Sequence, residues 1–229
     1  MSKFHAYLKG KNKHITPSIL SADFNHLGKS VEDCISRGMQ ILHFDVMDGH
    51  FVPAISFGPP VLKSLNKTFD CFFDVHLMVT HPQNQVHQFI SAGADHITFH
   101  VESDCDIPSL IQIIKDEDIG VGLVVKPNTD WKVLIPFLAD LDLILIMTVE
   151  PGAGGQAMLE DCLSKVVELK EYMQENGLDV PVQIDGGVNV RTMEKAVACG
   201  ADLFVAGSAV FGDSDGTVAG YDKLDQYLK

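Results

Sequence analysis

The chain has 229 residues, of which 46% are hydrophobic and 21% are charged, and its formal net charge is −14. These proportions are typical of a globular protein and argue against long disordered stretches. The acidic balance argues against a nucleic-acid partner or an anionic membrane surface, because both attract basic patches. No run of about 18 apolar residues is present, so we expect no membrane span.

The amino terminus is polar and lacks the apolar core of a signal peptide. We interpret residues 1–13 as a leader outside the fold and residues 14–229 as one domain. Five cysteines are scattered along the chain without a CxxC pair, which is typical of reduced thiols. The sequence therefore predicts a cytoplasmic protein.

Eight short apolar runs alternate with segments of helical spacing along the whole chain. Runs of this kind predict strands that are buried on both faces. They are Ile15–Leu20, Gln40–Val46, Cys71–Met78, His96–Val101, Gly120–Lys126, Leu143–Val149, Val180–Asp185 and Leu203–Ala206. Eight such units predict a single α/β domain of the closed (β/α)8 (TIM) barrel type. The main rival is an open doubly wound sheet, but Leu20–Phe24 (LSADF) is not a dinucleotide fingerprint after the first strand.

In either architecture, ligands bind beyond the carboxyl ends of the strands. Side chains alternate along a strand, so His43 and Asp45 share one face of the second run, and His76 lies on the matching face of the third. Asp185 ends the seventh run. Two imidazoles and two carboxylates predict a divalent metal site, with Zn²⁺ or Fe²⁺ as the first expectation and Mn²⁺ or Co²⁺ as alternatives. The plainer alternative is a set of hydrogen-bonded core residues.

Asp45 and Asp185 are expected to come from opposite sides of the barrel. Inversion of a carbon beside a carbonyl removes a proton on one face and returns it on the other, which two carboxylates can do as base and acid. A metal ion would stabilise the enediolate between these steps. Structural aspartates that cap loops are the alternative interpretation.

Glycine-rich segments follow the last three runs. Gly186-Gly187 follows the seventh and Gly207-Ser208 the eighth, where barrels commonly bind phosphate through backbone N–H groups. Residues 150–156 contain Gly152, Gly154 and Gly155 and predict either a flap over the substrate or a surface turn. Ser18 ends the first run, where its hydroxyl can reach a polyol. Three strand-end methionines predict either core filler or an apolar collar that excludes water, namely Met47, Met78 and Met147.

Six motifs of the chain, in order, resemble the signatures of the ribulose-phosphate 3-epimerase family. They are PSILSAD (17–23), HFDVMDGHFVP (43–53), DVHLM (74–78), MTVEPGAGGQ (147–156), DGGV (185–188) and VAGSA (205–209). The resemblance implies a (β/α)8 barrel that interconverts D-ribulose 5-phosphate and D-xylulose 5-phosphate through a metal-stabilised enediolate. It implies that His43, Asp45, His76 and Asp185 hold the metal, with Asp45 as base and Asp185 as acid.

The same resemblance predicts which residues contact the substrate or its phosphate, and these are Ser18, His76, Gly152, Gly154, Gly155, Gly186, Gly187, Gly207 and Ser208. Two positions depart from the family pattern: Ala54 stands where the family usually has Asn, and Ala153 where it usually has Phe. Neither is an expected ligand, so we expect activity, with substrate preference left open.

Three other functions compete with this interpretation. A sister epimerase of a six-carbon ketose phosphate, such as D-allulose 6-phosphate, would share the same site residues. Barrel decarboxylases resemble this group in fold but carry Lys two residues after their first Asp, where this chain has Met47. A non-catalytic sugar-phosphate sensor should have lost a ligand or a carboxylate, and none is lost. We also expect a homo-oligomer.

Overall fold

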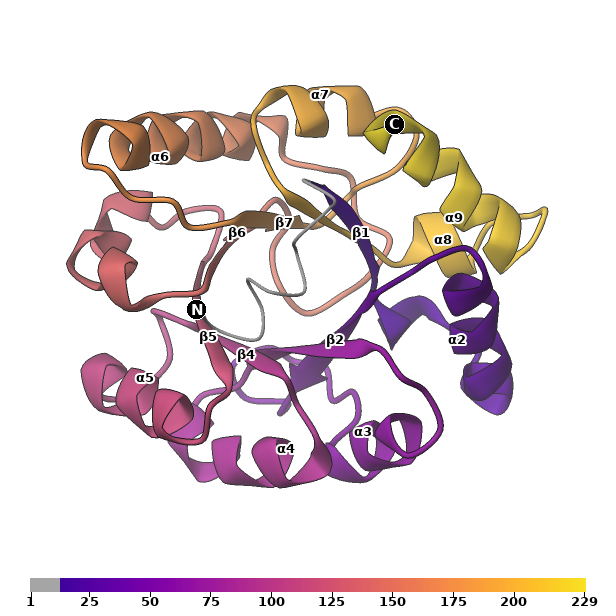
Figure 1. Ribbon diagram of the computed structural model, residues 1–229, viewed down its shortest axis with the longest axis horizontal. Helices are drawn as coiled ribbons and strands as arrows, with labels where there is room; N and C mark the ends of the chain where they lie inside the picture. The colour runs from indigo at the N-terminus through magenta and orange to yellow at the C-terminus, as the bar shows by residue number, and fades with distance from the viewer. Residues whose placement is uncertain (1–12) are drawn as a thin grey trace.

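The computed structural model describes residues 13–229, which form a barrel of eight parallel strands (Figure 1). The strands are β1 (His14–Pro17), β2 (Ile41–Met47), β3 (Phe72–Met78), β4 (His96–His100), β5 (Gly120–Val125), β6 (Leu143–Met147), β7 (Val182–Asp185) and β8 (Leu203–Ala206). From β2 to β8 each strand pairs with the next in chain order, β8 also pairs with β1, and a parallel bridge between Ser18 and His43 joins the end of β1 to β2. The structure thus confirms the predicted (β/α)8 barrel, and the predicted runs differ from the strands only at their ends.

Helices surround the strands on all sides in Figure 1. The α-helices are α2 (Leu27–Ser36), α3 (Pro59–Asn66), α4 (Val86–Ala92), α5 (Ile107–Asp116), α6 (Leu163–Glu175), α7 (Met193–Ala198), α8 (Ser208–Phe211) and α9 (Thr217–Asp225). Short 3₁₀ helices are η1 (Ile19–Ser21), η2 (Phe24–His26), η3 (Pro82–Asn84), η5 (Glu160–Cys162) and η6 (Gln226–Leu228), while η4 (Trp131–Asp140) is longer. Between β5 and β6 only η4 occurs, because Pro136 inside it lacks the N–H that an α-helix requires.

Helix α5 shows how the sequence specifies an outer helix. The Asp106 side chain caps its start by accepting a hydrogen bond from the Ser109 N–H. Leu110, Ile111 and Ile114 recur at helical spacing and are buried in the main hydrophobic cluster between helices and barrel. None of the helices in residues 13–229 has the length and apolar character needed to cross a bilayer.

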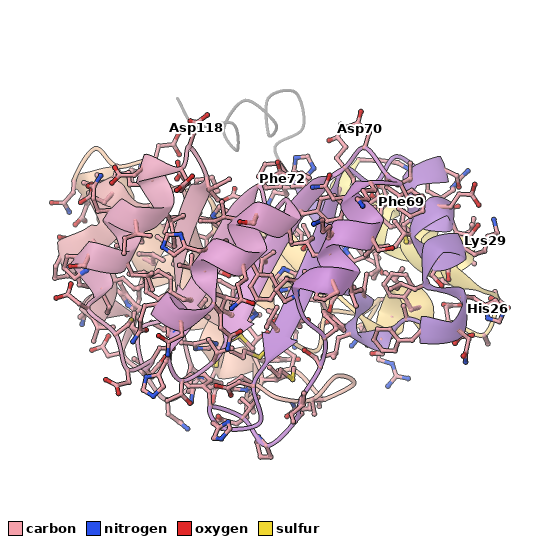
Figure 2. The ribbon with its side chains drawn as sticks, turned by 90° about the horizontal axis from the view of Figure 1, so that it is seen from below. His26, Lys29, Phe69, Asp70, Phe72 and Asp118 are labelled. Atoms are coloured by element: carbon pink, nitrogen blue, oxygen red, sulfur yellow. The ribbon has the colours of Figure 1, made fainter. Side chains whose placement is uncertain are left out.

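The interior of the barrel is layered. Ile41, Phe72, Leu143 and Leu203 form an apolar layer near the amino ends of the strands. Figure 2 shows Phe72 at this end, with Asp70 and Asp118 in loops that lead into strands.

Above the apolar layer the interior becomes polar, and the buried side chains include His43, Asp74, His96 and Gln183. Gly122 makes room for this polar layer, because a Cβ atom there would lie 2.7 Å from the Thr98 methyl carbon.

Two predictions at the amino end have different outcomes. The leader predicted for residues 1–13 lies outside the described residues except for Lys13, whose ammonium donates hydrogen bonds to the carbonyl oxygens of Val197 and Ala201. The predicted first strand was too long, because β1 ends at Pro17. The Ser18 hydroxyl then accepts a hydrogen bond from the Leu20 N–H and caps η1.

Candidate active site

A cluster of two histidines and two aspartates lies at the carboxyl ends of the strands. One donor atom each from His43, Asp45, His76 and Asp185 lies within 4.8 Å of the others. Asp45 Oδ1 is 3.3 Å from His43 Nε2 and 3.1 Å from His76 Nδ1, and Asp185 Oδ2 is 3.6 Å from His76 Nδ1. The structure therefore brings together all four residues that the sequence pattern selected, in an arrangement that could hold one metal ion.

Strand register and barrel closure produce this cluster. Asp45 on β2 lies opposite His76 on β3 in the parallel ladder, so their side chains share the inner face. Asp185 ends β7, which is separated from β2 by β8 and β1 on one side and by four strands on the other. The two carboxylates therefore approach the cluster from different sides of the barrel.

Asp74 lies closer to the amino end of β3 than His76 does and orients His43, a member of the cluster. Its carboxylate lies 2.8 Å from His43 Nδ1, 2.8 Å from His96 Nδ1 and 2.9 Å from Gln183 Nε2. An ionised carboxylate only accepts hydrogen bonds, so His43 must carry a proton on Nδ1, and Nε2 is the ring nitrogen left to face the cluster. That Nε2 is buried and has no hydrogen-bond partner among the described residues. A histidine that donates from Nδ1 to a buried carboxylate and turns Nε2 toward two further carboxylates has the arrangement of a carboxylate-oriented metal ligand.

The pKa values of the two catalytic candidates, Asp45 and Asp185, are shifted in opposite directions. Burial disfavours the charge of Asp45, but the attraction of His43 and the hydrogen bond with His76 outweigh it, so the pKa of Asp45 is lowered. For Asp185, burial and repulsion by the Asp45 charge together raise the pKa. The Ser18 hydroxyl also donates a hydrogen bond to Asp45 Oδ2, which favours its ionised form. One carboxylate is thus poised to accept a proton and the other to donate one.

The histidines respond to the same charges. Burial lowers the pKa of His43, but Asp45 and Asp74 outweigh this effect, and the net pKa is raised well above its ordinary value. The pKa of His76 is also raised, because hydrogen bonds with Asp185 and Asp45 outweigh burial. Before a cation is bound, the negative charge of the carboxylates is therefore balanced by protons on the rings.

A cavity opens beside the cluster and is bounded by the loops after β6, β7 and β8. Its lining includes both catalytic candidates, Ser18 and all the predicted glycines and Ser208. No lysine or arginine is among the described residues that line it. An anionic substrate group would therefore have to bind to backbone N–H groups and hydroxyls.

Two glycines of the cavity have no room for a side chain. Gly187 has a φ of 67°, and a Cβ atom there would lie 2.3 Å from the Met158 nitrogen. A Cβ atom at Gly207 would lie 2.6 Å from the Ser21 hydroxyl. Both positions therefore favour glycine, and both line the cavity.

The loop after β6 is held together by its own side chain. The Gln156 amide donates to the carbonyl oxygens of Glu150, at 2.7 Å, and Ala153, at 2.9 Å. Ala153 is exposed and lines the cavity. Ala54, the other departure from the family pattern, packs against the Met47, Val52 and Met78 cluster.

The predicted methionines all line the cavity, but they belong to two clusters. Met47 and Met78 pack with Val52, whereas Met147 packs with Val124, Leu145 and Val149.

Several buried polar residues that touch the site had no role in the sequence interpretation. Alternation along β3 puts Asp74 on the same face as His76, yet nothing in the sequence pattern showed that Asp74 binds His43. The sequence interpretation also gave no role to His96, Gln183, His100 or Glu102, although His96, Gln183 and His100 are fully buried. The only signal for them is their polarity within apolar runs.

The fold and the site define the class of protein: a (β/α)8 barrel with a buried His/Asp cluster that could hold a metal ion at its mouth. The profile described as the ribulose-phosphate 3 epimerase family matches residues 14–211, and the chain belongs to that family. It is accordingly an isomerase of the epimerase type, which places it in carbohydrate metabolism.

Curated relatives are similar over most of their length. The ribulose-phosphate 3-epimerase of Bacillus subtilis (strain 168) is 43% identical over 202 residues, covering 88% of this chain and 93% of its own. The Escherichia coli (strain K12) protein of the same name is 44% identical, covering 88% and 90%. The Treponema pallidum (strain Nichols) protein of that name is 43% identical, covering 86% and 90%.

Among solved structures, 3-hexulose-6-phosphate synthase from Salmonella typhimurium matches with a TM-score of 0.70 at 17% identity, covering 94% of this chain and 98% of its own. Mycobacterium tuberculosis tryptophan synthase matches with a TM-score of 0.69 at 12% identity, covering 99% and 98%. At these identities the likeness establishes the barrel fold alone.

Proposed function

We propose that this enzyme inverts C3 of D-ribulose 5-phosphate to give D-xylulose 5-phosphate. The observation that carries the proposal is the pair Asp45 and Asp185, which reach one cluster from different sides of the barrel with oppositely shifted pKa values. The names of the curated relatives support the choice of substrate.

Proton transfer would proceed in two steps. Asp45, ionised, takes the C3 proton on one face, and the C–H electron pair moves into a cis-enediolate of the substrate. Asp185, protonated, then returns a proton to C3 on the opposite face. In the reverse direction the roles exchange. The hydrogen bond from Ser18 to Asp45 holds the base in position.

The four-residue cluster suits a divalent cation with mixed nitrogen and oxygen ligands, Zn²⁺ or Fe²⁺ in the first place and Mn²⁺ or Co²⁺ otherwise. His43, Asp45, His76 and Asp185 would hold it. Such a cation supplies positive charge that offsets the negative charge developing on the substrate oxygens.

The remaining lining residues would bind and shield the substrate. Gly186, Gly187, Gly207 and Ser208 offer backbone N–H groups and a hydroxyl to the phosphate, and the loop with Gly152, Gly154 and Gly155 covers the sugar. Met47, Met78 and Met147 present apolar surface to the same cavity and would exclude water. The five cysteines are free thiols, which supports a cytoplasmic location.

Proton NMR of the purified protein with D-ribulose 5-phosphate in D₂O tests this function. We expect D-xylulose 5-phosphate with deuterium at C3, formed more slowly after metal stripping and restored by added Zn²⁺ or Fe²⁺. Exchange at C3 without product would contradict the role of Asp185. If the metal-replete protein leaves this substrate unchanged, the pentulose assignment is wrong, and turnover of D-allulose 6-phosphate would identify a six-carbon epimerase instead.

A further inference from the structure

His100 and Glu102 extend the contacts of His76 on the side of its ring away from Asp45 and Asp185. His76 Nε2 lies 3.0 Å from His100 Nε2, and the two rings are stacked with centroids 5.1 Å apart. His100 Nδ1 lies 3.2 Å from Glu102 Oε2. Both rings are fully buried, so water does not compete for these hydrogen bonds.

The two facing nitrogens share one proton. Two N–H groups would clash at 3.0 Å, and two lone pairs would leave both buried nitrogens unsatisfied. Either His76 donates to His100, or His100 donates to His76. The choice matters because His76 Nδ1 faces Asp45 and Asp185, and only a lone pair on that nitrogen can bind a cation.

Glu102 decides between the two arrangements. Its Oε1 accepts hydrogen bonds from the Lys126 N–H, at 2.9 Å, and from the Thr129 hydroxyl. These donors hold the carboxylate in place as an acceptor, so Oε2 requires a proton on His100 Nδ1. A neutral imidazole carries one N–H, which leaves His100 Nε2 as the acceptor. His76 must then donate from Nε2, which leaves Nδ1 as the nitrogen that can lose its proton and bind a cation.

We propose that Glu102 and His100 are positioning residues that fix the metal-binding tautomer of His76. The inference rests on the proposed metal centre and adds to it two residues that touch neither cation nor substrate. Glu102 would act on His76 through the His100 ring, as Asp74 acts on His43 by a direct hydrogen bond.

Long-range ¹H–¹⁵N NMR of the zinc-loaded protein, labelled with ¹⁵N in its histidines, tests the proton positions directly. We expect His100 to be neutral with its proton on Nδ1, which is the less common tautomer of histidine in water, and His76 to carry its proton on Nε2. A His100 ring protonated on Nε2, alone or together with Nδ1, overturns the inference. A merely structural role for Glu102 would not specify this tautomer.

Glu102→Gln provides the matched measurement. The glutamine oxygen keeps the hydrogen bonds from Lys126 and Thr129, so its NH₂ group faces His100 and reverses the proton order. We expect zinc affinity, measured by competition with a chelator, to fall about 10- to 100-fold. Glu117→Gln, the same change at an exposed carboxylate at the end of α5, should leave it unchanged.

The outcomes separate the two proposals. If the wild-type protein binds no zinc, the proposed metal centre itself fails. The other outcome is that the wild-type protein binds zinc while the affinity of Glu102→Gln stays within about threefold of the wild-type value. That change is well short of the one expected on losing a partner of a metal ligand, so the metal centre would stand and the role of Glu102 would be refuted.

Discussion

Replacement of Asp74 by Asn is the most informative perturbation of the site, because it changes one oxygen of a buried carboxylate and little else. Asp74 lies at 0% exposure and takes hydrogen bonds from His43, His96 and Gln183. In the best orientation the Asn oxygen keeps His43 and Gln183, which share Oδ2, and the amide NH₂ faces His96. One hydrogen bond to a charged acceptor is lost, and His43 loses a full negative charge beside Nδ1.

The magnitudes follow from those contacts. One buried hydrogen bond to a charged group contributes about 1.5–3 kcal/mol to the free energy of unfolding. Loss of the carboxylate behind a histidine ligand weakens metal binding about 10- to 100-fold, or about 1.4–2.8 kcal/mol. We expect Asp74→Asn to show both losses, in urea unfolding and in zinc competition with a chelator.

Asp70→Asn is the matched control, since Asp70 is exposed at the opposite end of the barrel (Figure 2). The control should show neither loss. A folded Asp74→Asn protein with wild-type zinc affinity would refute the argument that Asp74 orients His43.

Three further predictions address the acid, the phosphate loops and acid stability. Asp185→Asn should lower turnover by at least about 10²-fold in the D-ribulose 5-phosphate assay, and near-normal turnover would contradict its role as acid. Gly187→Ala should raise KM for the sugar phosphate, because its φ is 67° and the new Cβ would lie 2.3 Å from the Met158 nitrogen; an unchanged KM in steady-state kinetics would show that this loop does not bind the substrate. Burial raises the pKa of Glu102, but hydrogen bonds with His100 and Thr129 outweigh it and lower the pKa to about 2 from 4.5. This depressed pKa stabilises the fold above pH 4.5, and the stabilisation is lost as the pH falls toward 2, so urea unfolding should show wild-type stability falling by about 2 kcal/mol more than that of Glu102→Gln between pH 7 and pH 3. Parallel pH profiles of stability for the two proteins would contradict the lowered pKa of Glu102.

Much of the fold and of the cluster followed from the sequence. Eight apolar runs with helical segments between them predicted the barrel, because strands covered on both faces need no polar alternation. His43, Asp45 and Asp185 were selected because side chains alternate along strands and because barrel sites lie at the carboxyl ends. Both rules are local or architectural, and neither requires knowledge of which strands touch.

Tertiary structure alone decided how these groups bind one another. Asp74 and His96 are register partners on the neighbouring strands β3 and β4, whereas Gln183 on β7 reaches Asp74 only because the barrel closes. The facing nitrogens of His76 and His100 likewise depend on two ring rotamers fixed by packing. A hydrogen bond forms over about 3 Å, whereas the sequence specifies only which face of a strand a residue occupies. The sequence therefore determined which residues enter the barrel mouth, and the packed structure determined which atom of each faces the site.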